Sequence, residues 1–205
     1  MNKEKYLQDL EDIKDIMDRS SRFISLSGWS GIAAGVIALL GAYAAYSFVY
    51  VGQDYLRYER VIITDEVLLT IICIATVTLT LAVSFGIFFT SQKAKKNDQK
   101  LWDKQTRRLL INLFIPLATG GLLCLILLSK SFLGFVAPFT LIFYGLGLVN
   151  ASKYTLSEVR SLGLLQILLG LISTNYIGFG LLFWAIGFGV LHILYGIVMK
   201  VKYKD

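Results

Sequence analysis

The chain has 205 residues, of which 56% are hydrophobic and 17% charged, with a net charge of +6 and a mean hydropathy of +0.65. Soluble domains carry charge on about a quarter of their residues, so this composition excludes an ordinary soluble enzyme and indicates an integral membrane protein. Its excess of Lys and Arg follows the orientation rule for membrane proteins and calls for no nucleic-acid partner.

The first segment, residues 1–22, is charged and reads as an amphipathic cytosolic helix. Tyr6, Leu10, Ile13 and Met17 fall at positions i, i+4, i+7 and i+11, which places them in one apolar stripe on a helix. Either this leader folds back onto the protein's own basic loops or the lipid headgroups, or the stripe docks on a protein partner or on a second copy. Both alternatives stay open.

The remaining chain, residues 23–205, predicts an all-α transmembrane domain of six helices. A span needs about 20 apolar residues, and five long charge-free segments meet this requirement. The last of them, 161–199, is too long for one helix and is divided by the polar turn 173–178, sequence STNYIG. The expected helices are 24–50, 65–91, 109–129, 135–152, 157–174 and 178–199.

The distribution of basic residues predicts the orientation of this domain. With the N-terminus in the cytosol, 17 of the 20 Lys and Arg residues fall on the cytosolic side. Because cytoplasmic loops are enriched in Lys and Arg, we expect both termini in the cytosol.

An aromatic–Gly pair followed by Lys recurs three times and suggests three repeated helical hairpins. The pairs are Phe85–Gly86, Tyr144–Gly145 and Tyr195–Gly196, followed by Lys93, Lys153 and Lys200. Repeats at such spacing favour an internal triplication. The alternative is the ordinary composition of membrane helices, in which Gly is common and Lys marks the cytosolic end.

Glycines indicate where helices approach one another closely. Gly28, Gly31 and Gly35 lie on one small-residue face of the first predicted helix, which permits contact between backbones. This contact lies either inside the monomer or between copies in a homo-oligomer. The predicted packing residues are Gly28, Gly31, Gly35, Gly86, Gly145 and Gly196.

The interiors of the predicted spans contain few polar residues and no Asp, Glu, Lys or Arg. Asn112, Gln166 and His192 form the candidate polar membrane site, with interhelical hydrogen bonding or packing as the alternative role. Pro116 cannot donate to the carbonyl of Asn112, so that carbonyl is free for another partner. No catalytic, cofactor-binding or metal-binding motif accompanies these residues, and we therefore expect a protein that is not an enzyme and has no cofactor.

The run DRSSRFISLSGWSGIAAGVIALLGAYAAY resembles the start of a family of uncharacterised six-helix bacterial inner-membrane proteins. The plan of three glycine-rich hairpins also resembles the HdeD acid-resistance membrane proteins. These resemblances imply a multi-pass protein of the bacterial cytoplasmic membrane, and they assign no site residue.

Taken together, these patterns predict a non-enzymatic inner-membrane component with a structural, regulatory or stress-related role. It would act through contacts with proteins or lipids, with the bilayer itself as its first partner. The alternative is a channel or uncoupled transporter for a small neutral solute. A densely packed interior would favour the first role, and a continuous polar pathway the second.

Overall fold

The computed structural model describes residues 27–50, 64–97 and 101–203. Within these ranges the chain forms helices and turns and no strand, which confirms the all-helical fold class. The predicted leader helix and its apolar stripe lie outside the described residues.

The long helices are α2 (Gly28–Ala45), α3 (Asp65–Lys96), α4 (Lys104–Ser129), α5 (Val136–Ala151) and α6 (Ser157–Asn175). A π-helical turn, η1 (Tyr46–Tyr50), extends α2. The last helix is composite: α7 (Gly180–Trp184), a π-helical segment η6 (Ala185–Leu191) and α8 (His192–Tyr203). Short 3₁₀ turns precede or follow α5 and precede α7: η3 (Leu133–Phe135), η4 (Ser152–Tyr154) and η5 (Ile177–Phe179).

Three helices extend further than the sequence predicted, each at its charged end. α3 continues from the predicted end at 91 to Lys96, α4 begins at Lys104 instead of 109, and α8 continues past 199 to Tyr203. Apolar length sets how much of a helix fits in a membrane, but hydrogen bonding and capping set where it ends. Asp103 caps α4, because its Oδ1 accepts from the Thr106 backbone N–H at 2.7 Å.

Five helical stretches are long and apolar enough to cross a membrane, judged by length and composition: Gly28–Val49, Asp65–Lys96, Lys104–Ser129, Leu133–Tyr154 and Ile177–Tyr203. The predicted helix 157–174 is present as α6, with 19 residues, but it is not among these five. Glu158 and Arg160 occupy its first turn and lower its hydropathy. The fold is compatible with a multi-pass membrane protein.

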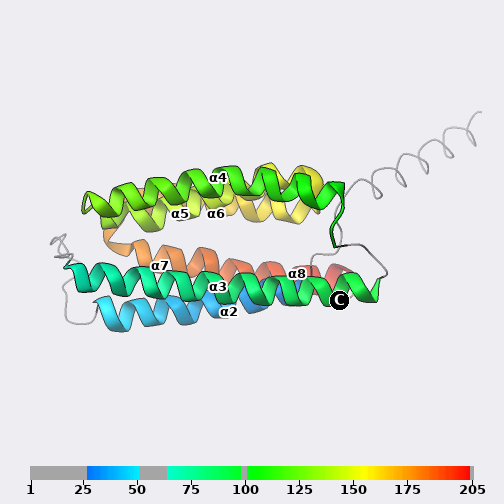
Figure 1. Cartoon of the computed structure of the whole chain (residues 1–205), viewed down its shortest axis with the longest axis horizontal. Helices are drawn as coiled ribbons and strands as arrows, with labels where there is room; N and C mark the ends of the chain where they lie inside the picture. The colour runs from blue at the N-terminus through cyan, green and yellow to red at the C-terminus, as the bar shows by residue number, and fades with distance from the viewer. Residues whose placement is uncertain (1–26, 51–63, 98–100, 204–205) are drawn as a thin grey trace, which may run out of the picture.

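The helices form two groups that lie side by side (Figure 1). One group contains α2, α3 and the composite helix α7–η6–α8, and α2 packs against both of the others. The other contains α4, α5 and α6, with α5 packed against both neighbours. Contacts of α5 and α6 with the composite helix join the two groups. The arms of the third predicted hairpin, α6 and α7–α8, therefore belong to different groups.

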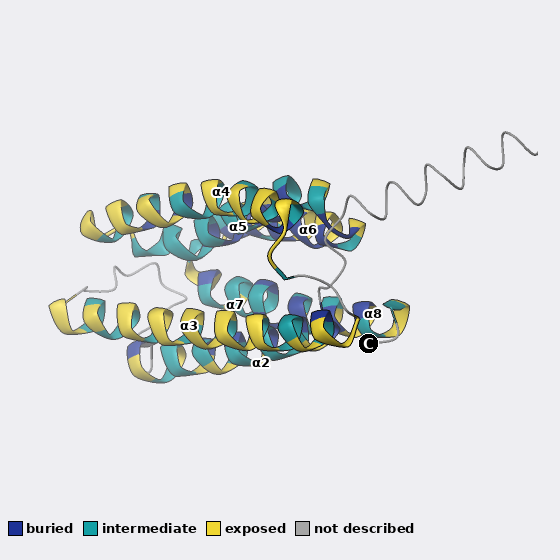
Figure 2. Ribbon diagram, turned by 45° about the vertical axis from the view of Figure 1, so that its right-hand side comes forward, coloured by how far each residue is buried: buried dark blue, intermediate teal, exposed yellow. Residues whose placement is uncertain are grey.

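Buried residues lie mainly on α2, α5, α6 and the composite helix, and they are few on α3 and α4 (Figure 2). Leu148 of α5 packs with Val159 and Leu162 of α6 in a hydrophobic cluster. In contrast, no residue in the most apolar stretch of α3 is buried. The apolar outer faces of α3 and α4 have the character expected of surfaces that meet lipid or protein.

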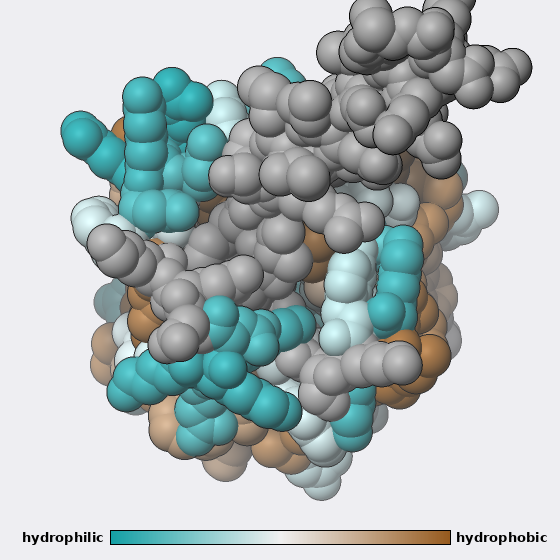
Figure 3. Space-filling model, turned by 90° about the vertical axis from the view of Figure 1, so that its right-hand side faces the viewer, coloured by the Kyte–Doolittle hydropathy of each residue, from teal (hydrophilic) through white to brown (hydrophobic). Residues whose placement is uncertain are grey.

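Hydrophilic residues gather at the end of the bundle where α3 and α8 finish and α4 begins (Figure 3). The last turns of α3 and α8 are basic, and α4 opens with Lys104. At this end Glu158 of α6 pairs with Lys202 of α8 and also accepts a hydrogen bond from the Tyr203 hydroxyl at 3.2 Å. This grouping places side chains from distant parts of the sequence at one polar surface.

Candidate functional site

The backbone carbonyl of Gly187 is the centre of a buried polar cluster. Gln166 of α6 donates from Nε2 to this oxygen at 2.7 Å, and His192 approaches it with Nδ1 at 3.0 Å. Gly187 lies in the π-helical segment η6, and His192 begins α8 five residues later. The wider π turn brings the His192 ring back toward this carbonyl. Two of the three predicted polar residues are thereby joined through one backbone atom.

Tyr144 of α5 completes the cluster, which we call the Gly187 cluster: Tyr144, Gln166, Gly187 and His192. The Tyr144 hydroxyl lies 2.8 Å from His192 Nε2. A carbonyl oxygen can only accept, so Nδ1 of His192 must carry a hydrogen to bond Gly187. In the neutral ring Nε2 is then an acceptor, and the Tyr144 hydroxyl donates to it. The geometry fits a neutral imidazole with a defined tautomer.

Aromatic rings pack around the His192 imidazole. Phe188 stacks on His192 with ring centroids 5.9 Å apart and planes inclined by 14°. The Phe188 ring also lies 5.0 Å from that of Tyr144 and 4.9 Å from that of Trp184. His192 retains only 6% of its accessible surface. An imidazolium buried here would lose its hydration, so the surroundings favour the neutral form.

Glycine at position 187 is required by the close approach of Gln166. A Cβ at this position would lie 2.6 Å from Gln166 Oε1 and would also collide with Leu141. Gln166 is completely buried, and its Oε1 has no hydrogen-bond partner among the described residues. Both polar atoms of the Gln166 amide therefore lie close to Gly187. Only Nε2 makes a hydrogen bond, which it donates to the Gly187 carbonyl.

Asn112, the third predicted polar residue, lies apart from the Gly187 cluster. Its own amide donates to Arg108 O within α4 at 2.8 Å. Its carbonyl, which Pro116 leaves without the usual helical donor, accepts from Asn150 Nδ2 of α5 at 3.1 Å. The carbonyl freed by proline thus forms an interhelical hydrogen bond, the alternative role considered from the sequence.

Glycines bring the backbones of two helix pairs into contact. Between α2 and α8, a Cβ on Gly28 would lie 2.5 Å from Gly196 O, and one on Gly31 would lie 3.0 Å from Gly196 Cα. Between α5 and α6, a Cβ on Gly145 would lie 2.6 Å from Gly163 O. These seams exclude both side chains and solvent.

The other predicted packing glycines differ from one another. Gly35 faces η6, where a Cβ would lie 2.6 Å from Gly189 O. Gly86 has open space instead, because a Cβ there would meet no atom of the described chain within 4 Å. Among the described residues, Gly86 therefore has no close neighbour on its Cβ side, in contrast to the other glycines of the predicted set. Among the described elements α3 makes its main contacts with α2 and η1, and the Cβ side of Gly86 lies away from them.

Three participants were absent from the sequence-based candidates: Tyr144, Gly187 and Asn150. Tyr144 belongs to one of the repeated aromatic–Gly pairs, but nothing in that pattern indicates His192 as its partner. Gly187 and Asn150 are recognisable only once the rotation of each helix is known. Among the residues that the structure describes, no three His, Cys, Asp or Glu side chains are grouped so that they could hold a metal ion.

Comparisons of the chain with protein-family models, with curated proteins and with solved structures find no match. The resemblances given above to bacterial inner-membrane families therefore stay predictions.

Proposed function

We propose that this chain is a non-enzymatic protein of the bacterial inner membrane, with six membrane helices and both termini in the cytosol. It acts through contacts with protein or lipid and serves a structural, regulatory or stress-related role. In this proposal α6 crosses the membrane in addition to the five long apolar stretches, and it packs against α5 and the composite helix.

The main support for this proposal is that polar side chains within the spans form hydrogen bonds to backbone carbonyls of the protein. Gln166 and His192 bond to Gly187 O, and Asn150 bonds to Asn112 O. Such side chains act as links between helices, since in hydrocarbon each polar group must be satisfied within the protein. The groups that would have to line a solute pathway are thus occupied with joining one helix to the next.

Two further features support contacts over transport. The glycine seams between α2 and α8 and between α5 and α6 leave no room for a solute at those interfaces. Meanwhile large apolar side chains on α3 point outward, among them Leu79 and Ile87, each 64% exposed. An outward apolar face is the surface through which a membrane protein meets lipids or another helix.

The proposal is tested by extracting the full-length protein from its own membrane in a mild detergent and determining its mass and its companions. We expect a protein retained in fixed ratio, because the leader stripe and the face of α3 offer contact surfaces. The informative variant replaces Tyr6, Leu10, Ile13 and Met17 with Ser. The matched control replaces Lys3, Glu4, Asp9 and Glu11 with Ser and so leaves the stripe intact.

A companion that is lost only with the stripe variant would support action through protein contacts. A particle that contains the chain alone, together with passage of glycerol or urea into vesicles that His192→Phe reduces, would contradict the proposal. That result would favour the uncoupled-transporter alternative.

A further inference from the structure

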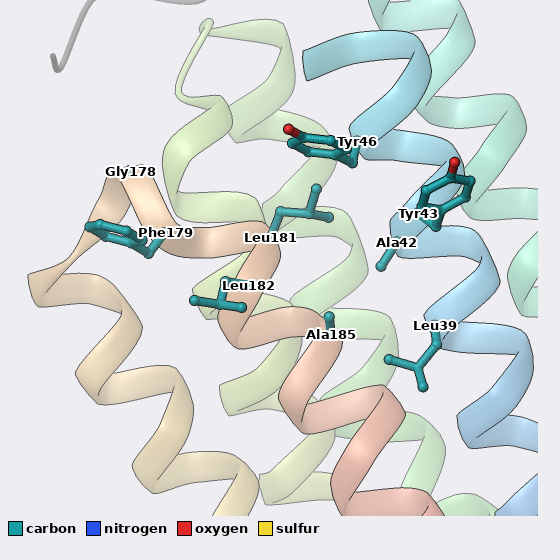
Figure 4. Close-up of a pocket in the computed structure, with 9 residues that line it drawn as sticks. All are labelled: Leu39, Ala42, Tyr43, Tyr46, Gly178, Phe179, Leu181, Leu182 and Ala185. Atoms are coloured by element: carbon teal, nitrogen blue, oxygen red, sulfur yellow. The ribbon is translucent and has the colours of Figure 1, made fainter. Parts of the chain in front are cut away.

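α2 and the composite helix are in contact near one end and diverge toward the other. Backbones touch at Gly28 and Gly196, and they remain close where Gly35 faces Gly189. Beyond this point, toward η1 and α7, the two helices separate around a hollow of about 390 Å³ (Figure 4). Leu39 lines the hollow on the side where it also packs against Gly189.

The hollow is lined by apolar side chains and two tyrosines. Six lining residues define its walls: Leu39, Ala42, Tyr43, Tyr46, Leu182 and Ala185. None of the described residues that line it is charged. Tyr43 is 70% exposed and Leu182 is 55% exposed, so the walls continue into the outer surface of the bundle. The hollow therefore opens sideways, toward whatever surrounds the helices.

Both walls belong to stretches that are long and apolar enough to cross a membrane, Gly28–Val49 and Ile177–Tyr203. Hydrocarbon therefore surrounds the opening if the chain spans a bilayer. An empty hollow would deprive its lining atoms of dispersion contacts. Water would need two to four polar partners, and the described side chains of the walls offer only the two tyrosine hydroxyl groups. The volume lies within the roughly 300–1,000 Å³ of small-molecule sites.

We propose that this hollow is a binding site for one acyl chain of a membrane glycerophospholipid. The chain enters between Tyr46 and α7, and its terminal methyl group lies toward Leu39 and Ala185. Tyr43 and Tyr46 stand at the wide end, where their hydroxyl groups meet the ester region, as tyrosine does at membrane interfaces. The neutral, apolar lining matches a hydrocarbon chain and continues the surface that faces lipid. This inference rests on the proposed membrane function.

The test uses the full-length protein in vesicles of phosphatidylcholine, a fraction of which carries a photoactivatable diazirine in the middle of one acyl chain. After illumination, cross-linked peptides are mapped by mass spectrometry. We expect labelling of segments 39–46 and 178–185 well above that of the exposed α3 face around Leu79. Labelling of the α3 face in the same sample gives the level of general lipid contact, and labelling above that level reports the site.

Ala185→Phe fills the hollow and should lower labelling of the two segments by about tenfold, equivalent to roughly 1.4 kcal/mol of binding free energy. Leu182→Asn is a second variant at an exposed position, and it should weaken labelling by making one wall polar. Ala75→Phe, on the exposed face of α3, is the matched control and should change nothing at the hollow.

Labelling of both segments at the level of α3, unchanged by Ala185→Phe and Leu182→Asn, would overturn the lipid site. So would cross-links that join segment 39–46 to a second copy of the chain. Because the vesicles contain no other protein, labelling above the level of the α3 face remains interpretable even if no protein companion is found in the native membrane. Failure of the lipid site and failure of action through protein contacts are therefore distinguishable.

Discussion

At the scale of single residues, Gly187 shows how one backbone atom organises side chains from separate helices. Its carbonyl accepts hydrogen bonds from Gln166 and His192, and the Tyr144 hydroxyl bonds to the other ring nitrogen of His192, Nε2. Interhelical hydrogen bonds in membranes contribute about 0.6 kcal/mol on average and up to roughly 1.7 kcal/mol. The cluster should therefore define the rotation of α6 against η6 more than it raises total stability.

Gly187→Ala is expected to lower the stability of the purified protein by about 1–3 kcal/mol, since the added Cβ overlaps Gln166 Oε1 and Leu141. Thermal unfolding in detergent, followed by the fluorescence of the tryptophans, measures the change. Gly86→Ala serves as the control, because its Cβ meets open space and alanine favours the helix. Equal behaviour of the two variants would contradict the geometry of the cluster.

His192 should be neutral at pH 7, with its hydrogen on Nδ1. It is the only histidine of the chain, so ¹⁵N-histidine labelling gives one pair of ring signals in a magnetic resonance spectrum. We expect a neutral pattern in which Tyr144→Phe shifts chiefly the Nε2 signal, since that variant removes its donor. An imidazolium, or a ring with its hydrogen on Nε2, would show that the assigned bond directions are wrong.

At the scale of helices, the pairs are held by small residues at the contact and by a few side-chain bonds to backbone. The three aromatic–Gly pairs share a sequence pattern but differ in their packing. Gly145 and Gly196 each touch a neighbouring backbone, whereas Gly86 on α3 touches none within the described chain. The pairs are therefore not equivalent in their packing, whatever the origin of the repeat.

The link between α4 and α5 can be tested through the carbonyl that Pro116 leaves free. Asn150→Ala should destabilise the protein by about 1 kcal/mol, because Asn112 O then loses its interhelical donor. In a Pro116→Ala background the same change should cost far less, since an alanine at 116 supplies the backbone N–H that this carbonyl normally receives. Thermal unfolding of the four proteins gives the coupling energy. A coupling energy of zero would mean that the Asn150 bond does not depend on the proline.

At the scale of the whole molecule, the helices form two groups of three joined through the composite helix α7–η6–α8. α6 lies at the junction and is more polar than its neighbours, with Glu158 near its start and Gln166 at its centre. Polar residues on a membrane helix are tolerated where other helices surround them. The packing of α6 against α5 and η6 is therefore compatible with a span, despite the lower hydropathy of α6.

If α6 crosses the membrane, its two ends lie on opposite sides. In a Cys73→Ser background, Lys153→Cys should react with a membrane-impermeant maleimide only after the cells are opened. Asn175→Cys should react in intact cells. Lys130→Cys is the external control and Lys95→Cys the internal one, by the proposed orientation. Labelling of both α6 positions from the same side would leave five spans and place the two termini on opposite sides of the membrane.

Local patterns were enough to predict the helices and most of their limits. The charge-free segments corresponded to α2–α6 and the last helix because apolar length and polar turns are recorded directly in the chain. The extra turns of α3, α4 and α8 were missed, since those turns are charged but remain helical and, for α4, capped by Asp103. Gln166 and His192 were found as polar exceptions in apolar helices, but their shared partner Gly187 was not.

The sequence by itself therefore determined the helical class, the apolar segments and the small set of polar residues within them. These properties depend on neighbours along the chain, where hydropathy and helix geometry act. Only the tertiary structure decided that Tyr144 meets His192, 48 residues away, and that α2 and α7 diverge around a hollow. Such contacts depend on the rotation and crossing of each helix, which follow from packing among all the helices together.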